Sequence, residues 1–116
     1  MISVIIPTLN VESDLPSTLS ALIPAAIEGL VREVIIVDGG STDQTLTIAN
    51  NTGARIITTQ KGRGHQLQTG AQHARHSWLF FLHADTELKQ GWEKYVSNFI
   101  DNVERKNSVS RAAALR

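Results

Sequence analysis

The sequence of 116 residues contains no cysteine, which excludes disulfide bridges, a thiolate metal site and thiol redox chemistry. No apolar stretch approaches the roughly 20 residues of a membrane-spanning helix, and no signal-peptide pattern opens the sequence. Basic and acidic residues are balanced at 11 each, so charge gives no argument for binding nucleic acid or an anionic membrane. These absences favour a cytoplasmic protein, and they are compatible with peripheral contact at the inner face of a membrane.

Hydrophobic residues make up 41% of the chain, which is enough for one domain with a core. They are concentrated in short, near-continuous blocks rich in β-branched and aromatic residues. Blocks of this kind are typical of parallel strands that helices cover on both faces. The predicted strands cover residues 2–6, 33–37, 54–59 and 78–82.

Helical patterns separate the predicted strands. Leu15, Leu19, Leu22 and Ile23 share one helical face, with Ser13 as the expected N-cap and Pro16 in the first turn. Residues 41–44 have the spacing of a capping box, and Gly53 is the expected C-cap of that second helix. A third helix is expected over residues 65–75. In the last helix, the spacing predicts an apolar face made of Trp92, Tyr95, Val96, Phe99, Ile100 and Val103.

This alternation of strands and helices predicts an α/β fold with a mostly parallel sheet and helices on both faces. The loops that follow parallel strands meet at one edge of the sheet, where open α/β sheets bind ligands. We expect residues 1–106 to form one domain. Residues 107–116 are either a tail or the start of a further, truncated element, because the run at 112–116 can begin a strand.

Small and acidic residues follow the second block as Asp38-Gly39-Gly40-Ser41. The glycines allow a tight turn and the close approach of a ligand, and a helix that begins near Ser41 would offer free N–H groups to an anion. Asp38 is placed to accept hydrogen bonds from a base or a ribose. The same residues are also ordinary turn chemistry with a capping serine, so both interpretations stay open.

Glycines surround an arginine after the third block, in Gly62-Arg63-Gly64, and Gln66 follows shortly after them. An arginine at the start of a helix suits recognition of a phosphate or of a planar base, because its guanidinium is flat and always charged. A solvated loop is the alternative interpretation.

A carboxylate follows the fourth block in His83-Ala84-Asp85. Oxygen ligands suit Mg²⁺ or Mn²⁺, and such an ion can bridge the oxygens of a diphosphate. The alternative is an aspartate that ends the strand and caps the following turn.

Taken together, four blocks resemble family 2 glycosyltransferases of the GT-A fold, from Ile2 to about Trp92. They read Ser-Val-Ile-Ile-Pro-Thr-Leu-Asn-x-Glu, Val-Ile-Ile-Val-Asp-Gly-Gly-Ser-Thr-Asp-x-Thr, Gly-Arg-Gly-x-Gln-x-x-x-Gly-Ala and Leu-Phe-Phe-Leu-His-Ala-Asp-Thr. The third and fourth are similar to those of a small bacterial subgroup. The resemblance implies a Rossmann-like nucleotide-sugar-binding half, with UDP as the usual nucleotide and Mg²⁺ or Mn²⁺ as cofactor.

The resemblance also implies roles for individual residues. His83 stands where the family's Asp-x-Asp motif has its first aspartate, and Asp85 matches the last aspartate, which holds the metal. Asp38 matches the residue that binds the base. The remaining nucleotide-binding residues implied by these blocks are Pro7, Thr8, Leu9, Asn10, Glu12, Gly40, Arg63, Gln66 and Ala84.

The sequence departs from the family in length, and no residue after Glu87 is a convincing general base. We therefore expect a donor-binding half that transfers sugar to a hydroxyl acceptor only in a full-length protein. One alternative is a non-catalytic module that binds itself or a partner. A nucleotidyltransferase-like enzyme is another, although the first strand is followed by no glycine-rich loop, and no Gly-x-Gly-x-x-Gly stands there for a dinucleotide.

Overall fold

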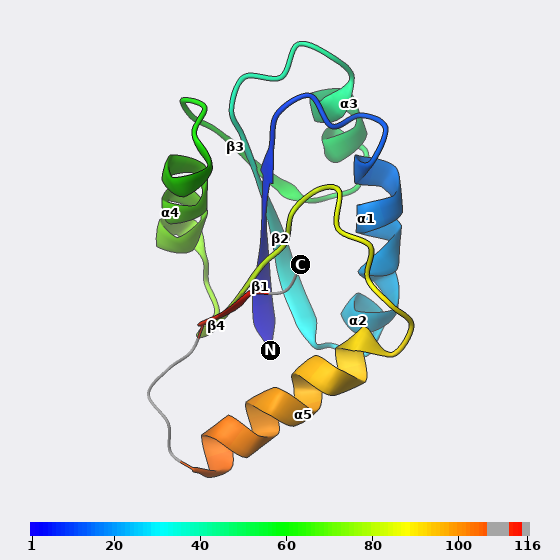
Figure 1. Ribbon diagram of the computed structural model, residues 1–116, viewed down its shortest axis with the longest axis vertical. Coiled ribbons are helices and arrows are strands. Elements are labelled where there is room, and N and C mark those ends of the chain that lie inside the picture. The colour runs from blue at the N-terminus through cyan, green and yellow to red at the C-terminus, as the bar shows by residue number, and fades with distance from the viewer. Residues whose placement is uncertain (107–111, 115–116) are drawn as a thin grey trace.

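The computed structural model describes residues 1–106 and 112–114. The strands in this part of the chain form one parallel sheet in the order β3-β2-β1-β4-β5 (Figure 1). They are β1 (Ile2–Thr8), β2 (Val31–Asp38), β3 (Arg55–Thr58), β4 (Trp78–Phe81) and β5 (Ala112–Ala114). The predicted α/β fold with a parallel sheet is therefore confirmed, and the four predicted strands agree with β1 to β4 to within two residues at each end.

Helices cover both faces of the sheet, as the sequence predicts. They are α1 (Leu15–Ala21), α2 (Ile23–Ile27), α3 (Thr45–Asn50), α4 (Arg63–His73) and α5 (Trp92–Arg105). In Figure 1, α4 lies on one side of the sheet and α1, α2 and α3 lie on the other. None of the helices in residues 1–106 has the length and apolar character that a membrane crossing needs.

Alternate side chains of β1 point to opposite faces of the sheet, and both faces are buried. Val4 and Ile6 belong to the larger core, on the side of α1, α2, α3 and α5. Ile5 belongs to a smaller core, where Leu67 and Ala71 of α4 pack. Burial on both faces explains why the strand has a continuous apolar run instead of an alternating one.

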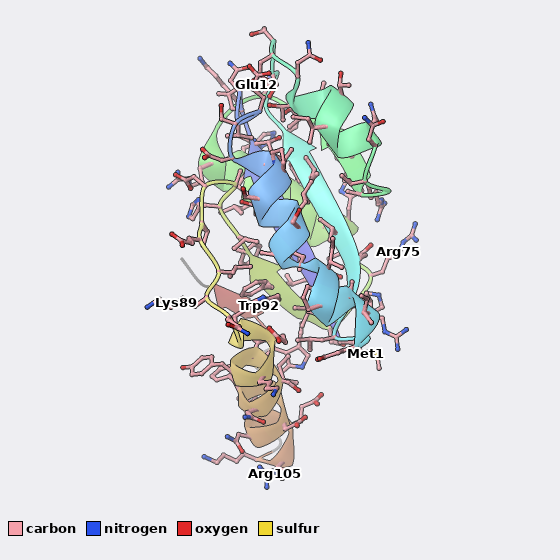
Figure 2. All side chains as sticks on the ribbon, turned by 90° about the vertical axis from the view of Figure 1, so that its right-hand side faces the viewer. Met1, Glu12, Arg75, Lys89, Trp92 and Arg105 are labelled. Atoms are coloured by element: carbon pink, nitrogen blue, oxygen red, sulfur yellow. The ribbon has the colours of Figure 1, made fainter. Side chains whose placement is uncertain are left out.

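The last helix joins the larger core along one side, through Trp92, Val96 and Ile100. The rings of Phe80 and Trp92 stack with centroids 5.4 Å apart. Figure 2 shows Trp92 at the end of α5 near the sheet and Arg105 at the far end. Tyr95 and Phe99 belong to the predicted apolar face of this helix, but they are 68% and 44% exposed. The ring of Phe99 still packs edge-on against Trp78 of β4, with centroids 6.1 Å apart, whereas Tyr95 lies mostly in solvent.

The first predicted helix is also interrupted. It divides into α1 and α2 at Leu22, because Pro24 has no backbone N–H to donate to the preceding turn. As a result, Ile23 is 54% exposed instead of packing with Leu15 and Leu22. Asp14, not Ser13, is the N-cap residue, and its side chain makes no capping hydrogen bond.

Two further boundaries differ from the sequence predictions. The C-cap of α3 is Asn51, and Gly53 follows two residues later with a left-handed φ of 78°. Helix α4 begins at Arg63, not His65, and ends at His73. Residues 107–111 and 115–116 lie outside the described residues, so the division of the chain at residue 106 stays a prediction.

Candidate functional site

A cavity of about 570 Å³ lies where β1 and β4 end and α4 begins. This is the edge at which parallel α/β sheets bind ligands. Three segments far apart in the sequence form most of its wall, one after each of β1, β3 and β4. The lining residues are Pro7, Thr8, Leu9, Val11, Asp14, Lys61, Gly62, Arg63, Gln66, His83, Ala84 and Asp85.

The structure brings most of the predicted site residues to this cavity. The predicted residues that line it are Pro7, Thr8, Leu9, Arg63, Gln66, His83, Ala84 and Asp85, whereas Asn10, Glu12, Asp38 and Gly40 do not. Lys61 and Asp14 also line it, and the sequence analysis assigned a role to neither. Lys61 follows the third apolar block and directly precedes the glycine-arginine motif, and both features point to it.

The carboxylate of Asp38 is fully buried. One oxygen accepts hydrogen bonds from the hydroxyls of Thr8 (2.7 Å) and Ser41 (2.6 Å). The other accepts from the amides of Gly40 (3.0 Å) and Ser41 (2.8 Å). Burial raises the pKa of this carboxyl, but the hydrogen bonds from Ser41, Thr8 and Gly40 outweigh it, and the pKa lies below its ordinary value. Asp38 thus shapes the turn after β2, and its contact with a base stays a prediction.

The predicted capping box is wrong, because α3 begins at Thr45 and not near Ser41. The Ser41 hydroxyl is turned back onto Asp38. Asp43 accepts hydrogen bonds from the Thr45 amide (2.9 Å) and hydroxyl (2.6 Å). These bonds lower the pKa of the Asp43 carboxyl, and the one from the Thr45 hydroxyl has the largest effect. No helix N-terminus is therefore free at Ser41 to receive an anion.

Asn10 and Glu12 connect the turn after β1 to the turn after β2. The Asn10 side-chain oxygen accepts hydrogen bonds from the amides of Thr42 (2.8 Å) and Asp43 (3.3 Å). A carboxylate oxygen of Glu12 accepts from the amide of Gln44 (3.2 Å). Two motifs that look like separate ligand loops in the sequence are therefore bonded to each other. In Figure 2, Glu12 lies at the end of the molecule opposite α5.

Opposite charges face the cavity from different segments. Lys61 and Arg63 are exposed cations before and at the start of α4, and Asp85 is an exposed carboxylate after β4. Ala84 is buried, and its carbonyl accepts a hydrogen bond from the Thr18 hydroxyl of α1. This bond fixes the backbone that carries Asp85. An anion with a bound cation would find both kinds of partner here.

The carboxylates at this cavity suit a divalent ion only in part. No group of three or more His, Cys, Asp or Glu side chains within residues 1–106 is arranged to hold a metal ion. Asp85 and Asp14 nevertheless line the same cavity. Mg²⁺ commonly binds through one or two carboxylates, with water and substrate phosphates completing its shell. The donor set therefore fits an ion that arrives with a diphosphate, and it does not fit a metal held by protein alone.

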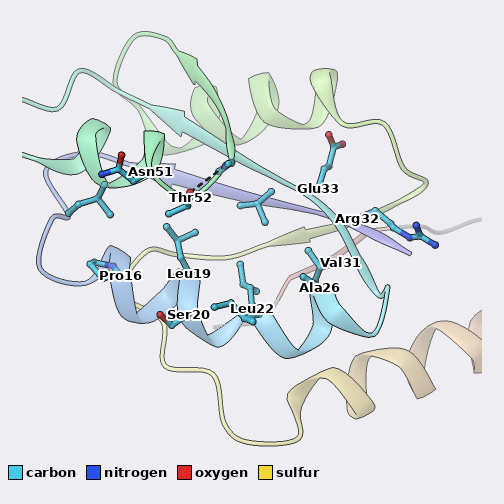
Figure 3. Close-up of a pocket in the computed structure, with 15 residues that line it drawn as sticks. Pro16, Leu19, Ser20, Leu22, Ala26, Val31, Arg32, Glu33, Asn51 and Thr52 are labelled. Atoms are coloured by element: carbon cyan, nitrogen blue, oxygen red, sulfur yellow. Dashed lines mark hydrogen bonds between the residues drawn. The ribbon is translucent and has the colours of Figure 1, made fainter.

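A second cavity of about 640 Å³ lies between α1, α2, α3 and β2 (Figure 3). Leu19, Leu22 and Val31 line it, and none of the predicted site residues does. Polar groups that converge on a ligand are the mark of a binding site, and these walls are mainly apolar. The cavity at the ends of β1 and β4 is therefore the candidate site.

The fold is a parallel α/β sheet with a charged cavity at its carboxyl edge, which is where sheets of this class bind ligands. Residues 3–111 match the family described as "Glycosyl transferase family 2". The chain therefore belongs to this family, as its four sequence blocks predict.

Two similar proteins of known name come from mycobacteria. The PGL/p-HBAD biosynthesis glycosyltransferase of Mycobacterium bovis (strain BCG / Pasteur 1173P2) is 42% identical over 76% of this chain and 36% of its own length. Glucosyl-3-phosphoglycerate synthase of Mycobacterium tuberculosis (strain CDC 1551 / Oshkosh) is 40% identical over 52% of this chain and 18% of its own length. The chain thus spans about a third of the length of the first relative and a smaller share of the second.

Solved structures show the same fold. The crystal structure of glucosyl-3-phosphoglycerate synthase from Mycobacterium tuberculosis with Mn²⁺ and UDP-glucose aligns with a TM-score of 0.66 and 31% identity. The match covers 73% of this chain and 33% of that one. Another crystal structure of that enzyme contains Mg²⁺ and UDP.

Proposed function

We propose that this chain binds the nucleotide-sugar donor, with UDP as the nucleotide, for a transferase that moves the sugar to a hydroxyl acceptor. The observation that carries the proposal is the cavity in which Lys61 and Arg63 face the same space as Asp85. A nucleotide diphosphate with a divalent cation needs both charges at once. The relatives crystallised with UDP and Mn²⁺ or Mg²⁺ support the proposal.

Each part of the cavity has a proposed role. Pro7, Thr8 and Leu9 border the base and ribose. The guanidinium of Arg63, with Lys61 beside it, contacts the diphosphate through charge-assisted hydrogen bonds. Asp85 holds Mg²⁺ or Mn²⁺, which would stabilise the negative charge that develops on the departing diphosphate.

His83 and Ala84 complete this wall of the cavity. His83 is half-buried and lines the cavity at the position where the family motif has an aspartate. We propose that it contacts the ribose, with a neutral or cationic ring in place of a carboxylate. Donor preference therefore differs from that of relatives with an acid there, because an imidazole and a carboxylate offer different hydrogen bonds.

Asp38, Asn10, Glu12 and Gly40 act indirectly in this proposal. None of them lines the cavity. The hydrogen bonds of Asp38, Asn10 and Glu12 hold the turns after β1 and β2 against each other. Gly40 has a φ of 104°, a conformation that glycine adopts readily, and its amide contacts Asp38. We assign no general base and no acceptor-binding residue within the described residues, and membrane contact stays a prediction.

Calorimetric titration of UDP into the chain tests the proposal. Arg63→Ala should weaken binding about tenfold or more, because a hydrogen bond to a charged group contributes about 1.5–3 kcal/mol. Arg75→Ala is the matched control, since Arg75 is exposed and does not line the cavity. Failure of the unaltered chain to bind UDP at millimolar concentration, or equal affinity in the Arg63→Ala variant, would count against the proposed site.

A role in self-association is the second candidate. Helix α5 exposes Tyr95 and Phe99 four residues apart, so their side chains lie on one side of the helix. Sedimentation analysis across a range of concentrations tests it. This candidate is supported if the mass of the unaltered chain rises with concentration while the Tyr95→Ser/Phe99→Ser variant stays monomeric. A monomeric mass of the unaltered chain at every concentration excludes it.

A further inference from the structure

The side chain of Gln66 is nearly fully buried, with 4% exposed, on the face of α4 that packs against the sheet. Its Nε2 group donates hydrogen bonds to the carbonyls of Thr8 (3.0 Å) and Val37 (2.8 Å). Its Oε1 atom accepts one from the amide of Gly62 (3.1 Å). Both N–H groups of the carboxamide are thus used by backbone at the ends of β1 and β2, and neither is left for a ligand.

Gly70 brings this part of α4 close to the sheet. It lies four residues after Gln66, on the same face of the helix. A Cβ atom at Gly70 would overlap Ile5 Cγ2 and lie 3.1 Å from Val37 Cγ2. Only glycine allows α4 to approach so closely, and this approach lets Gln66 reach the two carbonyls.

The loop before α4 is held down at the same place. A Cβ atom at Gly39 would lie 3.0 Å from both Gln66 Oε1 and Lys61 Cα. The backbone of Lys61 therefore passes directly over Gly39. Gly62 follows with a φ of 141°, which residues with a side chain rarely adopt.

We propose that Gln66 is a positioning residue that fixes the segment Lys61–Arg63 over the cavity, and that it is not a ligand of the nucleotide. The inference rests on the proposed function, because it assigns Lys61 and Arg63 to the diphosphate. Without Gln66 Oε1, the amide of Gly62 has lost its hydrogen-bond acceptor, and the backbone of Gly62 can adopt other conformations. Arg63, the next residue, then no longer has a fixed place at the wall of the cavity.

A double-mutant cycle measured by UDP titration tests this inference. Gln66→Leu removes the three hydrogen bonds at similar volume, and Gln68→Leu is the control at an exposed glutamine of the same helix. Gln66→Leu should weaken UDP binding about tenfold in the unaltered chain and less than about threefold in the Arg63→Ala variant, because coupled residues are non-additive. The same loss in both backgrounds would mean that Gln66 contacts the nucleotide itself, and no loss in either would also overturn the proposal.

A second measurement needs no ligand. In the free protein, amide hydrogen exchange at Gly62 should accelerate at least about tenfold in Gln66→Leu, while amides of β1 stay protected. Exchange at Gly62 should not change in Gln68→Leu, and an unchanged rate in Gln66→Leu would overturn the positioning role. Gln66→Met repeats the measurement if β1 loses protection in the leucine variant. If exchange at Gly62 is faster in Gln66→Leu but the unaltered chain does not bind UDP, the hydrogen bond between Gly62 and Gln66 is supported and the proposed function is rejected.

Discussion

The hydroxyl of Thr8 donates a hydrogen bond of 2.7 Å to the carboxylate of Asp38, and these residues form the last pair in the register of β1 and β2. The amide of Gly39 also donates to the carbonyl of Thr8 (2.9 Å). The ends of the two central strands are therefore bonded both through side chains and through backbone. This junction is the fixed base from which the loops around the cavity extend.

Asp38→Asn should destabilise the protein at neutral pH by about 1–3 kcal/mol, because it removes a buried acceptor from several donors. The pKa of Asp38 is lowered by folding. Its contribution is therefore fully present above the unfolded value of about 3.9 and is lost as pH falls through the lower folded pKa. Urea unfolding at pH 7 and below pH 4 measures the difference in the free energy of unfolding between the unaltered chain and Asp38→Asn.

Asp101→Asn is the matched control for that series, since Asp101 is exposed on α5. It should leave the free energy of unfolding unchanged to within about 0.5 kcal/mol. The difference between the unaltered chain and Asp38→Asn should shrink as the pH is lowered. A difference that stays constant from pH 7 to below pH 4 would contradict a charged Asp38 held by these hydrogen bonds.

Gly70→Ala should reduce the free energy of unfolding by about 1–3 kcal/mol, because the added methyl group overlaps Ile5 in a packed core. Gly64→Ala is the comparison in the same helix, where a Cβ atom meets nothing within 4 Å. It should be neutral or stabilising by up to about 1 kcal/mol, as expected for glycine replaced by alanine in a helix. Equal effects of the two substitutions in thermal or urea unfolding would refute the close approach of α4.

Asn10→Ala should loosen the turn after β2, because the side-chain oxygen of Asn10 bonds the amides of Thr42 and Asp43. Amide exchange at both positions should become faster. Asn10→Gly separates this effect from backbone strain. Asn10 has a φ of 52°, so alanine should be less stable than glycine there by about 1 kcal/mol. Unchanged exchange in both variants would show that the two turns are independent.

The fold could be predicted from local patterns, because buried parallel strands need continuous apolar runs. The runs around Ile5 and Ile36 have no polar interruption, and each proved to be a strand buried on both faces. Helix interruptions were less visible. Pro24 stands within an apolar periodic stretch, and its missing N–H ended α1 at a point that the periodicity alone does not mark.

The sequence named most of the residues that line the candidate cavity, but it did not give their hydrogen-bond partners. The sequence placed Asp38 and Gln66 near a ligand because both follow predicted strands and lie in blocks that resemble the family's nucleotide-binding motifs. The structure shows that their hydrogen-bonding groups bind backbone and neighbouring hydroxyls. Which partner a carboxylate or carboxamide takes depends on segments about 30 and 58 positions away, and no short motif encodes such long-range pairs.

Metal-dependent binding of UDP tests the central claim most directly. UDP is titrated by calorimetry into the chain with and without Mn²⁺, and into Asp85→Ala and Asp101→Ala under the same conditions. The account predicts that Mn²⁺ strengthens binding, that Asp85→Ala abolishes this effect, and that Asp101→Ala retains it. Binding that is equal with and without Mn²⁺, or a metal effect that survives in Asp85→Ala, would contradict a donor site in which Asp85 holds the cation.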